Sequence, residues 1–343
     1  MALQQLSIAD FRNLKDATLE FDSNINLIVG RNAAGKTSLL EALSVIVQGK
    51  SFRSRQLTPC IRKNRESFLL FARNHGHRCG FRYGPKKREL RIDGKNVHRI
   101  RELAQITAAV VMDHRSVDLV TGPPGNRRQF IDWLVFHVKP SYADLWSSAQ
   151  SILKQRNAIL RQRKDLDMLD YWDPLLVEQT ERVHRERLSV LNSLLDKDFG
   201  YRIEYRKGFD DDYGKQITRS RDTDIRQGFT RYGFTRADLK ITHQGLPVTE
   251  SASRGQLKSL SIELQTRSAE LIKKEAEKPC IVLIDDLQAE LDEQNLSKLY
   301  TRLLSLDLQL FVTGLTMDAF TGALKEGGRM FHVEHGMISH NPA

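Results

Sequence analysis

The chain has 343 residues, 40 % of them hydrophobic, which is enough to bury a core and suits one large domain with an insertion. Lys and Arg outnumber Asp and Glu by 53 to 43, and this excess favours a polyanionic partner such as nucleic acid. Three widely spaced cysteines without a C-x-x-C pair argue against zinc sites, and without a signal-peptide pattern or a bilayer-length apolar stretch we expect a cytoplasmic protein with no membrane partner.

A phosphate-binding loop follows the first predicted buried strand. Residues 25–29 are a branched apolar run, and residues 36–48 carry apolar side chains at helical spacing. The segment between them matches G-x-x-x-x-G-K-[ST] at every fixed position, and its residues are Gly30, Arg31, Asn32, Ala33, Ala34, Gly35, Lys36 and Thr37. We expect Lys36 to reach the β- and γ-phosphates of ATP and Thr37 to ligate Mg²⁺. A chance glycine turn before a helix is the alternative.

Short strands dominate up to about residue 113, and helical spacing takes over from residue 124 to about residue 195. The predicted strands and the tight turn that follows them lie at residues 68–72, 79–83, 89–92 and 93–94. Asp173-Pro174 interrupts the helical stretch, so we expect a turn or a fresh helix start there. Residues 201–239 are polar and uneven, with a predicted loop at residues 209–212.

Two further motifs lie near the C-terminus. Ser253-Arg254-Gly255-Gln256 precedes a helical stretch, where a Ser hydroxyl and a close-approaching glycine can meet a phosphate, although such a tetrapeptide is usually only an N-cap. Residues 281–284 form a buried-strand run that ends in Asp285-Asp286. A carboxylate at the end of such a strand can hold Mg²⁺, a role we assign to Asp285, while Asp286 could orient or deprotonate the attacking water. A strand that ends at a solvated turn is the alternative.

In this order the motifs resemble those of head ATPases of the ABC class, and the chain is similar nearly end to end to the RecF family, bacterial DNA-repair ATPases related to SMC heads. Residues 287–292 likewise resemble the loop that follows this strand in such heads. The segments that carry the RecF-like resemblance are residues 6–13, 49–53, 119–123, 127–132, 153–157, 236–239 and 253–258. The chain departs from the family pattern at Thr235 and at Asp113-His114-Arg115, where a Ser/Thr-Pro-Glu segment is common.

The resemblance implies an α/β, ABC/SMC-like ATPase head with a short antiparallel helical arm. We expect an N-terminal lobe at residues 1–123, the helical insertion at 124–240 and a C-terminal lobe at 241–343. It further implies a slow ATPase that dimerises with ATP between two heads, where Ser253 and Arg254 meet the partner's nucleotide. It also implies DNA binding at single/double-strand junctions and action with RecO and RecR in gap repair.

Basic clusters are the candidates for DNA contact through phosphates. They comprise Arg53, Arg55, Arg62, Lys63 and Arg65 after the phosphate-loop helix, Lys86, Lys87, Arg88 and Arg91 around a predicted hairpin, and Arg127 and Arg128 at a helix start. A solvated surface is the more common role of such a cluster. Rival functions are the ATPase subunit of a transporter, a nuclease with an ABC-like head, and a structural DNA-binding protein without turnover.

Overall fold

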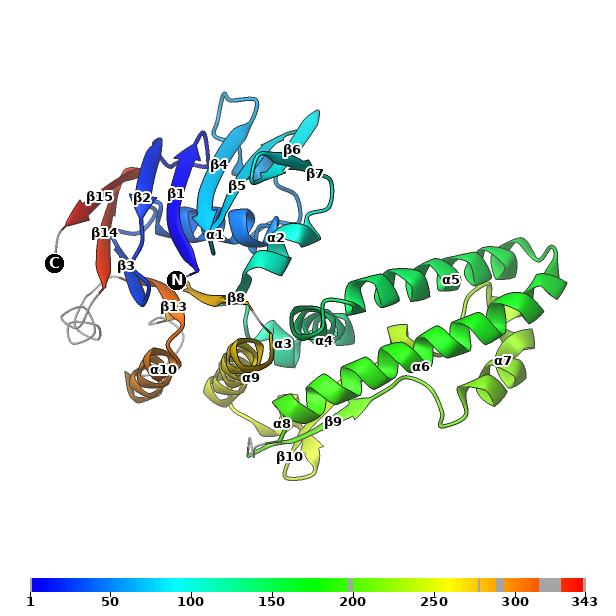
Figure 1. Ribbon diagram of the computed structural model, residues 1–343. Helices are drawn as coiled ribbons and strands as arrows, with labels where there is room; N and C mark the ends of the chain where they lie inside the picture. The colour runs from blue at the N-terminus through cyan, green and yellow to red at the C-terminus, as the bar shows by residue number, and fades with distance from the viewer. Residues whose placement is uncertain (1, 197–199, 277, 288–292, 315–327, 342–343) are drawn as a thin grey trace. The chain divides into compact units, whose positions relative to one another are not determined.

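The computed structural model describes residues 2–196, 200–276, 278–287, 293–314 and 328–341, which divide into two compact units (Figure 1). The first unit contains residues 1–116 and 261–343, and the second contains residues 117–260. These boundaries differ from the expected ones at 123–124 and 240–241. At the C-terminal boundary, β10 (Asp238–His243) pairs with β9 (Arg202–Arg206) and with β11 (Leu246–Pro247), which keeps this region in the second unit.

A largely parallel sheet forms one layer of the first unit. Its order is β15-β14-β3-β13-β12-β8, and only the β14–β15 pair is antiparallel. The strands are β3 (Ile25–Val29), β8 (Ala108–Met112), β12 (Cys280–Ile284), β13 (Gln309–Gly314), β14 (Arg329–Glu334) and β15 (Met337–Asn341). The runs of β3 and β12 are buried on both faces, as parallel strands in a covered sheet require, and both strand predictions are confirmed.

An antiparallel sheet of order β2-β1-β4-β5-β6-β7 forms the second layer. Its strands are β1 (Leu3–Ala9), β2 (Ala17–Glu20), β4 (Phe68–Asn74), β5 (His77–Gly84), β6 (Lys87–Ile92) and β7 (Lys95–Val97). Strict alternation of buried and exposed residues along β4 directs one face to the core and the other outward. The predicted strands at 68–72, 79–83 and 89–92 are confirmed with slightly wider bounds.

Helix α1 (Lys36–Gln48) lies between the two layers, packing on β4 and β5 on one side and on β8, β12 and β13 on the other. Every residue of α1 except Thr37 is therefore buried. The remaining helical segments of this unit are η1 (Thr58–Cys60), α2 (Arg101–Ile106), α10 (Glu293–Ser305) and the greater part of α9 (Arg254–Glu275). No helix among the described residues has the length and apolar character needed to cross a membrane.

The second unit is mainly helical, and α5 (Tyr142–Gln162) and α6 (Leu169–Leu194) run side by side as its longest pair (Figure 1). This pair confirms the expected antiparallel helical arm. The other helical segments are α3 (Asp118–Thr121), α4 (Pro124–Val138), η2 (Leu166–Met168), α7 (Tyr213–Gln227), η3 (Phe234–Arg236) and α8 (Val248–Ser251).

Two details of this unit differ from the sequence-based expectation. Asp173-Pro174 starts no new helix, because α6 begins at Leu169 and runs through Pro174. The break lies earlier, where Arg163 and Asp165 both have positive φ. The loop at residues 209–212 is confirmed, and Asp212 caps the unpredicted helix α7 by accepting a hydrogen bond from the Lys215 backbone N–H at 2.8 Å.

The core of the second unit contains ion pairs as well as apolar side chains. Arg156 is fully buried and donates to Asp173 at 2.6 Å and to Asp224 at 2.9 Å. Arg187 is equally buried and donates to the Asp132 carboxylate and to the Phe234 carbonyl. These contacts join α4, α5, α6 and α7 into one body.

Candidate nucleotide site

The phosphate loop joins β3 to α1, and two of its glycines have conformations that other residues rarely adopt. Gly35 has φ 126°, and a Cβ atom there would lie 2.9 Å from Leu14 Cδ2. A Cβ atom on Gly30, at φ 155°, would lie 2.2 Å from the Val333 carbonyl oxygen. The loop therefore packs so closely against β14 and its neighbours that glycine is required at both positions.

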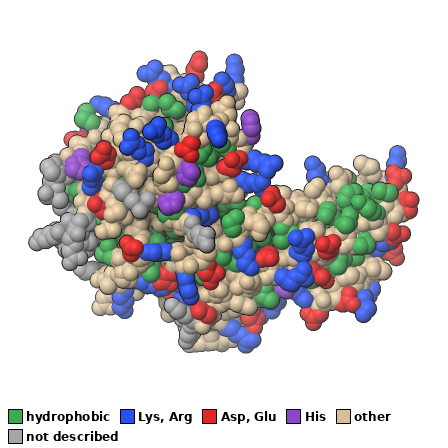
Figure 2. Space-filling model, in the orientation of Figure 1, with side chains coloured by type: hydrophobic (Ala, Val, Ile, Leu, Met, Phe, Trp, Pro, Cys, Tyr) green, Lys and Arg blue, Asp and Glu red, His purple; other side chains and the backbone are tan. Residues whose placement is uncertain are grey.

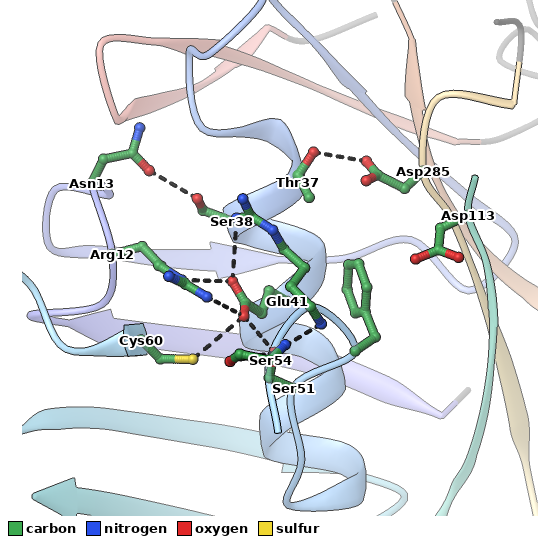
Figure 3. A network of polar contacts seen from close by, with 12 residues as sticks. Arg12, Asn13, Thr37, Ser38, Glu41, Ser51, Ser54, Cys60, Asp113 and Asp285 are labelled. Carbon is green, nitrogen blue, oxygen red and sulfur yellow. Dashed lines mark hydrogen bonds and ion pairs between the residues drawn. The ribbon is translucent and has the colours of Figure 1, made fainter. Parts of the chain in front are cut away.

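Lys36 and Thr37 begin α1 directly after this loop. The Lys36 ammonium donates to the carbonyl oxygens of Gly30 at 2.7 Å and Arg31 at 3.2 Å, so it lies along the loop. The Thr37 hydroxyl donates to Asp285 Oδ1 at 3.0 Å (Figure 3). A helix N-terminus, a cation and a hydroxyl–carboxylate pair thus converge, and this combination suits a polyphosphate.

Asp285 follows the last residue of β12 and is held from three sides. Its backbone N–H donates to the Met112 carbonyl at 2.9 Å, and its carboxylate accepts from Thr37 and from Thr313, the latter at 2.9 Å. Burial raises the pKa of Asp285 above its ordinary value, and the nearby carboxylates of Asp113 and Asp286 raise it further. A half-buried carboxylate beside other carboxylates and hydroxyls is a hard-oxygen donor set, and it fits Mg²⁺.

Asp286 takes the left-handed conformation at φ 51°, which Asp tolerates better than most residues. Its backbone N–H donates to Thr313 Oγ1 at 3.0 Å, so the residue is fixed to β13. Residues 288–292, which resemble the loop after this strand in ABC-type heads, lie outside the described residues.

A cavity of about 730 Å³ unites these groups. Its lining includes the predicted residues Asn32, Ala33, Gly35, Lys36, Thr37, Asp285 and Asp286. It also includes Arg53 and Lys63, which the sequence suggested as DNA contacts, and Arg12 and Asn13, for which it suggested no role. Arg53 and Lys63 thus face the same cavity as the phosphate loop.

A network of polar contacts around one carboxylate positions the arginines that line this cavity (Figure 3). Glu41 of α1 is fully buried and accepts two hydrogen bonds from Arg12, at 2.8 and 2.6 Å, and one from Ser51 at 2.5 Å. Arg53 lies 3.5 Å from the same carboxylate, and the Cys60 thiol lies 3.4 Å from it. Burial opposes ionisation of Glu41, but the hydrogen bonds from Arg12 and Ser51 outweigh it and lower its pKa. The sequence signal for this residue is a lone acid within the apolar run of α1.

Arg115 connects the end of β8 to the segment after α1. Its guanidinium donates to Asp113 Oδ2 at 2.7 Å, to the Arg53 carbonyl at 3.4 Å and, by a short contact, to the Phe52 carbonyl. At 113–115, where the chain departs from the family pattern, Arg115 therefore connects the end of β8 to the backbone of the segment that carries Arg53.

The Ser253–Gln256 element begins α9, and all four of its residues are exposed. Ser253 Oγ accepts from the Gln256 backbone N–H at 3.3 Å, and the Gln256 side chain accepts from the Ser253 backbone N–H at 2.8 Å. This reciprocal pair is a capping box, and it presents the start of a 22-residue helix to solvent.

The other candidates for DNA contact differ in their environments. Arg127 is 12 % exposed and donates to Asp238 and to the carbonyls of Val120 and Gly122. Arg128 donates to the Ala237 carbonyl at 3.0 Å, and burial lowers its pKa. Both side chains hold the second unit together, whereas Arg55 is exposed.

Comparison with known proteins places these features in a family. The family model described as "RecF/RecN/SMC N terminal domain" matches residues 2–339. Curated proteins named "DNA replication and repair protein RecF" are similar throughout. The one from Cellvibrio japonicus is 37 % identical, covering 99 % of both chains, and the one from Shigella boydii is 33 % identical, covering 99 % of this chain and 100 % of its own.

Solved structures show the same fold at lower identity. A structure described as the recombination mediator protein RecF with ATP in the RecFOR pathway gives a TM-score of 0.86 at 22 % identity, covering 99 % of this chain and 98 % of the other. An Smc head bound to the C-terminal winged-helix domain of ScpA gives 0.55 at 14 % identity, covering 99 % and 97 %. Together with the family model, these likenesses confirm the expected ABC/SMC-like head fold.

Proposed function

The chain belongs to the RecF family, and from this premise we propose that it is an ATP-binding protein of DNA replication and repair, whose bound nucleotide controls its hold on DNA. The observation that carries the proposal is the cavity in which Lys36, Thr37 and Asp285 converge on the phosphate loop. A RecF structure with ATP shares this fold, which supports ATP as the nucleotide.

Each residue of the cavity has a distinct part in this proposal. Lys36 and the N–H groups at the start of α1 hold the phosphates, while Thr37 and Asp285 would hold Mg²⁺, which neutralises charge that develops on phosphate oxygens. Asp286 orients the attacking water or accepts its proton. An Asp side chain reaches less far than a Glu side chain, so we expect weak, DNA-stimulated hydrolysis of ATP. Release of DNA after hydrolysis would then be slow.

Ser253 and Arg254 are the proposed contacts to nucleotide held by a second copy. They lie exposed at the first turn of α9, where backbone N–H groups and the helix dipole favour a phosphate. Closure of two heads over ATP would then produce an ATP-dependent homodimer. Within this proposal Lys36→Ala removes both ATP binding and dimerisation, whereas Asp286→Asn traps the ATP dimer.

DNA is the proposed polyanionic partner, bound through its backbone without sequence readout, with a preference for double-stranded DNA or single/double-strand junctions. A net charge of +10 supports it. The RecFOR pathway named for the related structure supports action with RecR and RecO in recombinase loading at gaps.

Light scattering with and without ATP and short gapped DNA tests the switch. The wild type should dimerise only with ATP, and Ser253→Arg should remain monomeric while it still binds ATP. Ser147→Arg, at an exposed position of α5, is the matched control and should behave as the wild type. A protein that is monomeric under every condition would refute the dimer, and unchanged nucleotide binding by Lys36→Ala would refute the site.

A further inference from the structure

The outward face of the antiparallel sheet carries apolar side chains that the core does not use. Along β4, Phe68, Leu70 and Ala72 are buried, whereas Leu69 and Phe71 are 39 % and 37 % exposed. We define this outer sheet face by Ser7, Thr18, Leu69, Phe71, Arg73, Arg78, Gly80, Arg82, Glu89 and Arg91, which point away from α1 by strand alternation.

The ring of Phe71 stands beside open space on this face. Its partner across the β4–β5 ladder is Gly80, so no side chain covers the ring there, and a Cβ atom on Gly80 would lie 3.9 Å from Phe71 Cδ2. A hollow of about 400 Å³ lies on the β1–β2 side, lined by Leu69, Phe71, Ile8, Asp16 and small residues. The Asp16 carboxylate pairs with Arg62 at 2.7 Å. The hydroxyls of Ser7 and Thr18, which belong to this lining, form a hydrogen bond at 2.9 Å. The hollow is therefore apolar with a polar edge.

Arginines surround the apolar pair. Arg73 and Arg78 lie directly opposite each other in the β4–β5 register, Arg82 lies opposite Leu69, and Arg91 of β6 lies opposite Gly80 of β5. Like charges placed directly opposite in a sheet are unfavourable, so this arrangement costs stability unless an anion offsets it.

Two carboxylates lie near these arginines. Glu89 lies directly opposite Arg82 in the β5–β6 register, and Asp93 accepts a hydrogen bond from the Arg78 backbone N–H at 2.9 Å. Glu89 pairs with Lys87, and Asp93 pairs with His77 at 2.7 Å. Among the described residues no ion pair joins Arg73, Arg78 or Arg82 to an acid, and the side chains of all three are exposed. Figure 2 shows Lys and Arg side chains at the top of the molecule with Asp and Glu side chains among them. The face thus combines unpaired cations with an exposed aromatic ring.

We propose that the outer sheet face binds single-stranded nucleic acid, with a base in the hollow against Phe71 and Leu69 and with phosphates held by Arg73, Arg78 and Arg82. A duplex hides the faces of its bases, so the hollow and the ring would add nothing to its binding, whereas an unpaired base can stack on an aromatic ring. The inference rests on the proposed function, in which this face would receive the single-stranded part of a junction.

Fluorescence anisotropy with labelled oligo(dT) and with a labelled blunt duplex tests the face on the full chain. Phe71→Ala should weaken oligo(dT) binding by about tenfold and leave duplex binding unchanged. Phe229→Ala is the matched control, because Phe229 is an exposed aromatic residue at 41 % in the second unit. Arg78→Ala should lower the salt dependence of oligo(dT) binding by a log–log slope of about 0.7, whereas Arg202→Ala, 78 % exposed, should not.

Phe71→Trp provides a readout that does not depend on loss of binding. It should keep the affinity, and oligo(dT) should quench the emission of the new tryptophan relative to the wild type. If oligo(dT) binds but Phe71→Ala and Arg78→Ala equal their controls, the inference is refuted and the proposed function stands. Binding of the duplex without any binding of oligo(dT) would likewise refute the inference and leave the proposed function standing. If the wild type binds ATP but neither DNA, the DNA part of the proposed function fails as well.

Discussion

One buried cluster of arginines and carboxylates in each unit shows two different uses of charge. In the second unit one buried arginine, Arg156, lies between two carboxylates, Asp173 and Asp224. In the first unit two arginines, Arg12 and Arg53, share the single buried carboxylate of Glu41 and remain 19 % and 43 % exposed beside the cavity. In the cluster around Arg156 the carboxylates neutralise the arginine, whereas in the cluster around Glu41 the arginines outnumber the carboxylate and leave positive charge for a ligand. In these two clusters, burial of the arginine marks an internal ion pair, and exposure of the arginines beside the cavity marks charge that a ligand can reach.

Removing Arg156 should produce the largest effect on stability. Arg156→Met leaves the buried Asp224 without its arginine and leaves Asp173 with Arg221 alone, and breaking such a buried pair costs about 3–5 kcal/mol in free energy of unfolding. Urea unfolding followed by circular dichroism measures this loss. Arg202→Met, on an exposed side chain of β9, is the control and should change little. An unchanged midpoint for Arg156→Met would contradict a structural role.

Glu41→Gln tests the cluster of the first unit, in which one carboxylate positions two arginines. Loss of the charged hydrogen bonds to Arg12 should lower the free energy of unfolding by about 1.5–3 kcal/mol. ATP affinity should fall as well, because both arginines lose the group that positions them. Unfolding and titration with a fluorescent ATP analogue measure the two effects, with the exposed Glu20→Gln as control. Loss of stability with unaltered ATP affinity would limit Glu41 to a structural role.

The pH dependence of Glu41 has a definite sign. Its pKa is lowered in the folded state, so its stabilising contribution is fully present above the unfolded-state value, about 4.3, and is lost as pH falls through the lower folded-state value. The Glu41→Gln variant should therefore lack this part of the acid-induced loss of stability.

Asp285→Asn should act in the opposite direction. The pKa of Asp285 is raised by burial, so the ionised carboxylate costs stability at neutral pH, and that cost disappears as pH falls. Without nucleotide the variant should be about 1 kcal/mol more stable at neutral pH, an advantage that shrinks in acid, and it should lose Mg²⁺-dependent ATP binding. Thermal melting and ATP titration check this, with the exposed Asp307→Asn as control.

An exposed ion pair should give the smallest effect. Lys207 and Asp211 pair at 2.7 Å in the second unit, but Asp211 is fully exposed. Asp211→Asn should therefore change the free energy of unfolding, measured by urea denaturation, much less than any of the variants above. A loss as large as that of Arg156→Met would show that burial does not separate the two classes of pair.

Local patterns made the nucleotide-binding segment predictable. Buried residues 25–29, the glycine loop and the apolar spacing of α1 are contiguous, and each element follows from the chemistry of its own residues. The Pro174 prediction was wrong because proline was taken to begin or break a helix, whereas α6 accommodates it in its second turn and Asp173 anchors that turn to Arg156. Tertiary contacts overrode the local signal there.

By itself the sequence determined the family, the α/β head with its helical arm, and the strand and helix that flank the phosphate loop. Tertiary structure alone decided which charges act together. Arg12 and Arg53 meet Glu41, and Arg127 meets Asp238, across up to 111 positions of the chain. The face that Phe71 shares with Arg78 likewise depends on strand register. Side-chain chemistry sets what each residue can do. Long-range packing decides which charges are neutralised by ion pairs and which remain free for a ligand.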